Sequence, residues 1–163
     1  MTRLEVTETI ERPLDVLQRL LLDPQMLEAF IDQQHPTVKR VDVDRRARRS
    51  TLVWTTTLDG QVPGIVSRFV GRSFDITASL SAETGPLSID IRGKHDGNLR
   101  GSLELDMVDA NTTRITVRGD ITISVGIGSG TAEKLARDQV LEPIFVEDLF
   151  PLLREWPDPP AAP

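Results

Sequence analysis

The last long stretch of the chain, residues 127 to 156, repeats apolar residues at steps of three or four. This spacing places them on one face of a helix, whose period is about 3.6 residues. The face comprises Leu141, Phe145, Leu149, Leu152 and Trp156, and it is widened by Leu135, Ile144, Phe150 and Leu153. Pro143 and Pro151 each remove a backbone donor, which predicts a bend near each proline. The pattern predicts one long, bent helix that needs a large apolar partner.

Most of the earlier chain alternates apolar and polar residues instead, as half-buried strands do. About seven such segments occur, near residues 3–11, 41–43, 52–58, 74–80, 87–95, 99–107 and 115–125. Two short amphipathic stretches that open at Pro13 and Pro24 predict helices between the first and second strands. We therefore expect an α+β fold in which a curved antiparallel sheet wraps around the long final helix.

The segment from Val62 to Gly71 is more apolar than a short connection between neighbouring strands requires. Pro63 opens it, and Val66 and Phe69 lie on its apolar side. The sequence predicts a helical turn that covers the mouth of a cavity, with Val66 and Phe69 facing a ligand.

Size and charge limit the class of protein. A chain of 163 residues is expected to form one domain, here over residues 1–156, followed by a disordered proline-rich tail at 157–163. The net charge of −6 argues against nucleic-acid binding through phosphate neutralisation. Neither a signal peptide nor an apolar run of the roughly 20 residues that span a bilayer is found. With zero Cys, a cytoplasmic location is the default expectation, and the pattern leaves the oligomeric state open.

Three stretches of sequence point to a known family. They are ERPLDVLQRLLLDPQMLEAF, VPGIVSRFVGR and GSGTAEKLARDQV, the last of which begins the final helix. Together with the order of strands and helices, they resemble the START-like or Bet v 1-like (SRPBCC) superfamily and, within it, the bacterial family DUF2505. The resemblance covers nearly the whole chain and implies a helix-grip fold. It also implies a cavity between sheet and long helix, which holds a hydrophobic ligand in many relatives.

Candidate chemistry is sparse. Glu8 lies between Val6 and Ile10 on an apolar strand face, where an unpaired carboxylate is costly. Two interpretations are open. Glu8 could act as a proton donor or acceptor in a cavity, or it could be a structural residue whose carboxylate reaches solvent or an arginine. His95, at a strand end, has the same two interpretations. The chain has 2 His and no Cys, so we expect no metal site and assign no catalytic residue.

The glycines near the start of the final helix match a dinucleotide-binding loop only in part. Gly126, Gly128 and Gly130 are present, but Thr131 occupies the position near which a further glycine is needed. No strand follows the helix to complete a βαβ unit. We therefore expect a hinge here and no cofactor.

The leading hypothesis is non-catalytic binding of a small hydrophobic molecule or lipid between the sheet and the final helix. The expected apolar lining is Trp54, Phe74, Ile76, Ile89, Leu103, Val117, Leu141 and Phe145, with Glu8, Thr56 and His95 as polar neighbours. An enzyme of the cyclase or dehydratase kind is an alternative, and a cavity in which Glu8, Thr56 and His95 converge favours it. A partner-binding module with a filled core is a third possibility, and the absence of a pocket favours that one.

Overall fold

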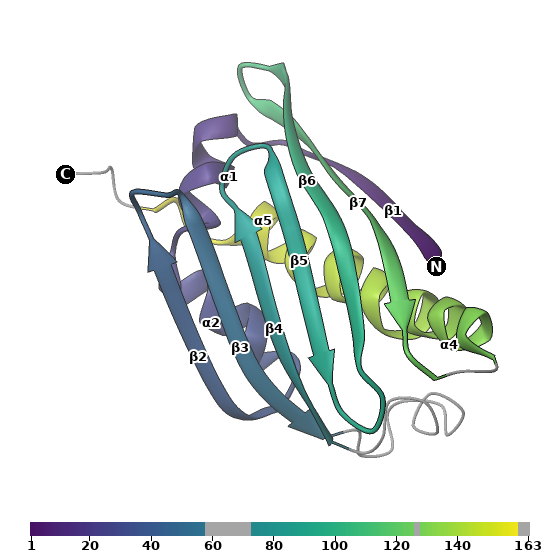
Figure 1. The fold of residues 1–163 in the computed structure, drawn as a ribbon. Coiled ribbons are helices and arrows are strands. Elements are labelled where there is room, and N and C mark those ends of the chain that lie inside the picture. The colour runs from purple at the N-terminus through teal and green to yellow at the C-terminus, as the bar shows by residue number, and fades with distance from the viewer. Residues whose placement is uncertain (58–72, 126–127, 160–163) are drawn as a thin grey trace.

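The computed structural model describes residues 1–57, 73–125 and 128–159 and shows a curved antiparallel sheet with helices behind one face (Figure 1). The seven strands lie in the order β1-β7-β6-β5-β4-β3-β2. Their bounds are Thr2–Ile10 (β1), Pro36–Asp44 (β2), Arg49–Thr57 (β3), Ser73–Ser81 (β4), Gly85–Arg92 (β5), Gly97–Asp109 (β6) and Thr112–Ile123 (β7). The predicted strand count and helix-grip arrangement are confirmed.

The alternation in the sequence becomes a difference between the two sheet faces. In β4, Phe74, Ile76, Ala78 and Leu80 are buried and face the helices. The opposite face carries charged side chains, where Arg100 pairs with Asp90 at 2.5 Å. A sheet with one apolar face needs a cover, and the helices provide it.

The two short helices follow β1 at the residues where the sequence places their starts. α1 spans Leu14–Leu20 and α2 spans Pro24–Asp32. The Asp23 carboxylate accepts a hydrogen bond from the Gln25 N–H at 2.9 Å and caps α2, while Pro24 occupies a first-turn position that lacks a partner anyway. The apolar face of α2 is buried, which closes one end of the space under the sheet.

The C-terminal helix runs along the apolar sheet face in four segments (Figure 1). They are α4 (Ser129–Ala136), the π-helical η1 (Arg137–Leu141) and η2 (Ile144–Leu149), and α5 (Phe150–Glu155). Each π-helical segment ends two residues before a proline, Pro143 or Pro151. Proline has no N–H to donate to the carbonyl four residues before it, and its ring clashes with that carbonyl. A π turn relieves both problems, because the carbonyl accepts a hydrogen bond from the N–H one residue further along. The prolines thus widen this helix locally.

The π turns also change which residues of the helix are buried. Leu141, Phe145 and Leu149 are buried as predicted. Leu152 and Trp156, expected on the same face, are only partly buried at the margin of the core. A π turn contains more residues than an α turn, so it rotates the later side chains, and Phe150 and Leu153 take the fully buried positions.

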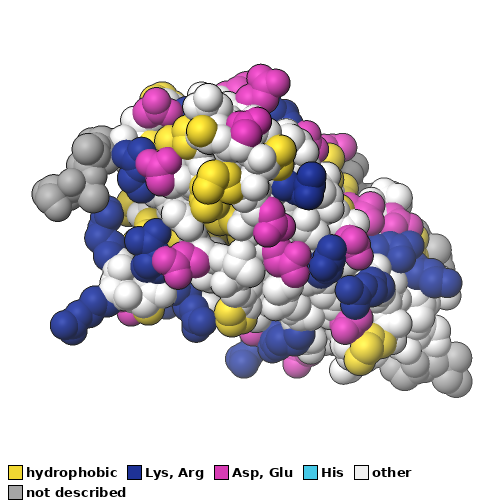
Figure 2. Space-filling model, turned by 90° about the horizontal axis from the view of Figure 1, so that it is seen from above, with side chains coloured by type: hydrophobic (Ala, Val, Ile, Leu, Met, Phe, Trp, Pro, Cys, Tyr) yellow, Lys and Arg dark blue, Asp and Glu magenta, His cyan; other side chains and the backbone are white. Residues whose placement is uncertain are grey.

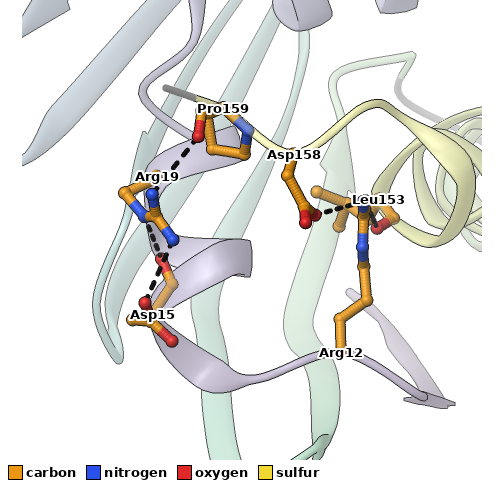
Figure 3. Close-up of polar contacts among 6 residues, drawn as sticks. All are labelled: Arg12, Asp15, Arg19, Leu153, Asp158 and Pro159. Carbon is orange, nitrogen blue, oxygen red and sulfur yellow. Dashed lines mark hydrogen bonds and ion pairs between the residues drawn. The ribbon is translucent and has the colours of Figure 1, made fainter. Parts of the chain in front are cut away.

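Two arginines near the start of the chain, Arg12 and Arg19, form hydrogen bonds with the C-terminal segment (Figure 3). Arg12 donates to the Leu153 carbonyl at 3.0 Å and to the Asp158 carboxylate at 2.7 Å. Arg19 donates to the Pro159 carbonyl at 3.3 Å and to Asp15 at 3.1 Å. The proline-rich composition of residues 157–163 predicts a disordered tail, and this stays a prediction. Residues 160–163 lie outside the described residues.

Lys and Arg are interspersed with Asp and Glu on the face seen in Figure 2. The arginine-rich turn between β2 and β3 is largely exposed, and Arg48 there pairs with Glu83 at 2.7 Å. Within the described ranges, no helix has the length and hydrophobicity needed to cross a bilayer. The predicted cover formed by Val62 to Gly71 lies outside the described residues.

Candidate functional site

A cavity of about 410 Å³ lies where the end of β3 and the start of β4 meet the C-terminal helix and the chain after α2. We call it the main cavity. Its described lining consists of Gln33, Gln34, His35, Trp54, Thr56, Thr57, Phe74, Ile76, Gln139, Val140, Pro143, Ile144 and Asp148. Pockets that hold small molecules measure about 300 to 1,000 Å³, so this volume suits one.

Burial separates the lining into a polar mouth and an apolar floor. Gln33, His35 and Gln139 are exposed and mark the mouth. The floor is formed by buried side chains, namely Trp54, Phe74, Ile76 and Ile144. Such a division suits an amphipathic molecule whose polar end faces solvent.

A hydrogen-bond chain joins three elements at the mouth. The Thr56 hydroxyl of β3 donates to the Gln34 carbonyl at 2.8 Å, and the Gln34 side-chain amide donates to the Asp148 carboxylate of η2 at 2.6 Å. His35 follows directly with φ of +51°, a left-handed conformation that is uncommon outside glycine. The loop after α2 is therefore held in a defined conformation beside the cavity.

Among the described residues that line the main cavity, Asp148 supplies the carboxylate. Burial raises the pKa of its carboxyl group, the hydrogen bond from Gln34 opposes that shift, and the nearby charge of Glu147 adds to it. Pocket carboxyls with raised pKa values occur both in proton-transfer sites and in ion-pairing sites. Within the described parts of the chain, no group of three or more His, Asp or Glu residues is placed to hold a metal ion.

Two small apolar voids lie beside the main cavity, each of about 20 Å³. One is lined by residues such as Leu27, Ile89 and Phe145, and the other by residues such as His95 and Ile123. A void of this size holds at most one water, and an apolar one stays dry. Val140 lies in the wall of the main cavity and of both voids, so it borders all three spaces.

The predicted lining residues fall into three groups. Trp54, Thr56, Phe74 and Ile76 line the main cavity, and Ile89, His95, Leu141 and Phe145 line the inner voids. Leu103 and Val117 are fully buried opposite each other on β6 and β7, away from these three spaces. Val66 and Phe69 lie outside the described residues.

Glu8 is placed apart from the cavity. Its carboxylate accepts a hydrogen bond from Arg154 at 2.6 Å, and the side chains of the pair are 34% and 43% exposed. This arrangement corresponds to the structural interpretation of Glu8, a carboxylate near a strand end that reaches an arginine. Glu8, Thr56 and His95 therefore do not converge on one pocket.

Sequence reasoning missed most of the polar mouth, namely Gln33, Gln34, His35, Gln139 and Asp148. These side chains come from a loop and from the polar edge of the helix, where a search for apolar periodicity finds nothing. The sequence held one indication of this mouth. The helical spacing predicts that Leu149 is buried, and Asp148 is the acid next to it.

Comparison with known proteins supports the fold. A model of the family described as "Protein of unknown function (DUF2505)" matches residues 5–150. The Zhui aromatase/cyclase from Streptomyces sp. R1128 is a similar structure, with TM-score 0.62 and 16% identity over 93% of this chain and 91% of that chain. A START superfamily protein from Mycobacterium smegmatis has TM-score 0.56 and 13% identity over 90% and 93% of the two chains.

An uncharacterised protein from Rhizobium leguminosarum reaches TM-score 0.63 at 9% identity, covering 93% of each chain. At these identities the likeness shows the fold alone. A search among curated proteins found no match.

Proposed function

The chain belongs to the DUF2505 family and has a START-like fold, and from this premise we propose that it binds a small hydrophobic molecule or lipid without converting it. The main cavity is the binding site. The observation that supports this most is the cavity volume of about 410 Å³ between sheet and helix, with buried aromatic and aliphatic side chains on its floor. Such a concave apolar space with a few polar groups is typical of small-molecule sites.

The floor supplies the driving force for binding. Trp54 and Phe74 are 2% and 5% exposed and present aromatic surface that a hydrophobic ligand can cover. The mouth supplies orientation, because Gln34 and Thr56 are already held by hydrogen bonds and need little reordering when a ligand enters. The partner-binding alternative assumed a filled core, and the main cavity counts against it.

Mass spectrometry of material extracted from natively purified protein tests the proposal. We expect an apolar small molecule in a ratio near one per chain. Gln139→Trp should lower the recovered amount, because it places an indole at the mouth. Asp138→Trp changes the neighbouring exposed residue, which does not line the cavity, and should leave the amount unchanged. Empty protein that also fails to bind a series of alkyl alcohols in calorimetry contradicts the proposal.

Acid–base catalysis in the same cavity is the second candidate function. Asp148 favours it, since burial raises the pKa of this carboxyl group toward the range useful for proton transfer. One similar structure carries the name aromatase/cyclase. If the extracted compound loses water or closes a ring on incubation with the protein, and Asp148→Asn stops that change while binding persists, this function replaces simple binding.

A further inference from the structure

The charge of the main cavity narrows the kind of ligand. Among its described lining residues, Asp148 is the only one with a formal charge when His35 is neutral. The other polar side chains there are amides and hydroxyls, which donate or accept without a net charge. The described part of the lining therefore carries one negative charge above an apolar floor.

Among the described residues, the hydrogen-bond partner of Asp148 is neutral. The Gln34 amide donates to one carboxylate oxygen at 2.6 Å. In the described part of the chain, no Lys, Arg or His nitrogen forms an ion pair with this carboxylate, although eleven ion pairs are found elsewhere. The negative charge of Glu147, the adjacent residue on the helix, repels the Asp148 carboxylate and adds to its cost. A partly buried carboxylate without a cation is costly, and a well-placed bound cation offsets part of that cost.

We propose that the ligand of the main cavity is a hydrophobic amine, whose ammonium group pairs with Asp148 while its apolar part covers Trp54 and Phe74. This rests on the proposed function and specifies the chemistry of its ligand. An ammonium–carboxylate hydrogen bond is roughly twice as strong as a neutral one. Aromatic residues beside a cation add a further attraction when their faces are reachable.

The same charge disfavours the commonest hydrophobic ligands. A fatty acid places a second carboxylate near Asp148, and two like charges in a partly buried site repel. An alcohol of the same length makes a neutral hydrogen bond only. The predicted order of affinity is therefore amine, then alcohol, then acid.

Calorimetric titration with decylamine, decanol and decanoic acid tests this order near neutral pH, because the three molecules share one alkyl chain. For the natural protein we expect decylamine to bind about tenfold more tightly than decanol, the difference that one charge-assisted contact supplies. Decanoic acid should bind most weakly. Asp148→Asn should abolish the advantage of the amine and leave decanol affinity within about threefold.

Glu147→Gln is the matched control, since it removes an equal charge from the adjacent exposed residue, which does not line the cavity. It should keep the preference for the amine. If decanol binds as tightly as decylamine, or Glu147→Gln acts like Asp148→Asn, the amine assignment is wrong while hydrophobic binding stands. If none of the three probes binds, the proposed function fails together with the amine assignment.

Discussion

Burial acts differently on two carboxyl groups of the C-terminal helix. Glu133 is 1% exposed, and burial alone would raise the pKa of its carboxyl group. The Glu133 carboxylate contacts the Met1 ammonium at 2.6 Å, the Ile123 N–H at 3.1 Å and the Thr2 hydroxyl at 3.1 Å. Together these contacts outweigh the effect of burial and lower the pKa of the carboxyl group. In the described part of the chain, Asp148 accepts one hydrogen bond from Gln34, and burial raises the pKa of its carboxyl group despite it. Glu133 joins the helix to the sheet, whereas Asp148 lies in the lining of the main cavity.

The lowered pKa of Glu133 predicts a dependence of stability on acid. A group with a lowered folded pKa stabilises the native state above its ordinary pKa, and that contribution is lost as pH falls through the lowered value. Glu133→Gln should lower the free energy of unfolding near neutral pH by about 1 to 3 kcal/mol, because a charged acceptor is lost.

Urea unfolding between neutral and acid pH measures both effects. The variant should lose less stability than the natural protein as the pH falls. Parallel curves for the two proteins would show that the Glu133 carboxyl group has the same pKa in the folded and unfolded states, which contradicts this prediction.

Single residues also show where sequence reasoning succeeds. The position of Glu8 in an alternating strand predicted a carboxylate that needs a partner, and Arg154 is that partner. The identity of the arginine was not predictable, since 146 positions separate the two residues along the chain. Asp148 escaped notice for the same reason, because its burial depends on Gln34 from another element.

At the scale of elements, the C-terminal helix differs from prediction in its winding. The sequence predicted bends at Pro143 and Pro151, and the structure places a π-helical segment before each. Periodicity calculated for an α-helix then overstates the burial of some later residues, which explains why Leu152 and Trp156 are only partly buried. Proline signals a disturbed helix, but packing decides whether the disturbance is a kink or a wider turn.

Phe145→Ala tests the burial of this helix. Phe145 is 3% exposed and lines an inner void. The centres of the Phe145 and Phe150 rings are 6.4 Å apart. We expect the free energy of unfolding to fall by about 3 to 5 kcal/mol, as when a core aromatic is removed. Denaturant titration gives this value, and a loss below about 1 kcal/mol would indicate that the site is already open.

A glycine pair on β6 and β7 carries a second test at this scale. Gly101 and Gly119 face each other in the register of these strands. A Cβ at Gly101 would lie 1.8 Å from the Arg118 carbonyl oxygen and 2.5 Å from the Gly119 Cα. Since backbone atoms cannot yield cheaply, Gly101→Ala should destabilise the fold by about 1 to 3 kcal/mol or more.

Gly130→Ala in α4 is the matched control for that substitution. Its Cβ would meet nothing within 4 Å, and its position in a helix favours alanine. Gly130→Ala should increase the free energy of unfolding by up to about 1 kcal/mol and raise the melting temperature slightly. Equal melting temperatures for Gly101→Ala and the natural protein would mean that the strands separate without cost.

For the whole molecule, alternation and helical spacing were enough to predict the sheet, the helices and their order. They did not place the cavity along the length of the helix. A period of two identifies the buried face of a strand, but Leu103 and Val117 share that face with Trp54 and Ile76 while lying under another part of the cover. Where a cavity opens depends on the relative positions of segments that are distant in sequence.

Val140 gives a prediction for the whole interior, since its side chain borders the main cavity and both inner voids. Val140→Ala should join these spaces and cost about 1 to 2 kcal/mol of stability. Calorimetry with alcohols of increasing length should show a shift toward longer chains. Val146→Ala removes the same atoms at a position that is 44% exposed and should change neither property. An unchanged length preference in Val140→Ala would show that the spaces stay separate.

The placement of Trp54 on the cavity floor has an optical consequence. The chain contains 2 Trp and no Tyr, so its near-ultraviolet emission comes from Trp54 and Trp156. Trp156 lies at the far end of the helix from the mouth residue Gln139, at the margin of the core. In a Trp156→Phe protein the remaining fluorophore, Trp54, lines the main cavity, so the wavelength and intensity of its emission should change when a molecule enters.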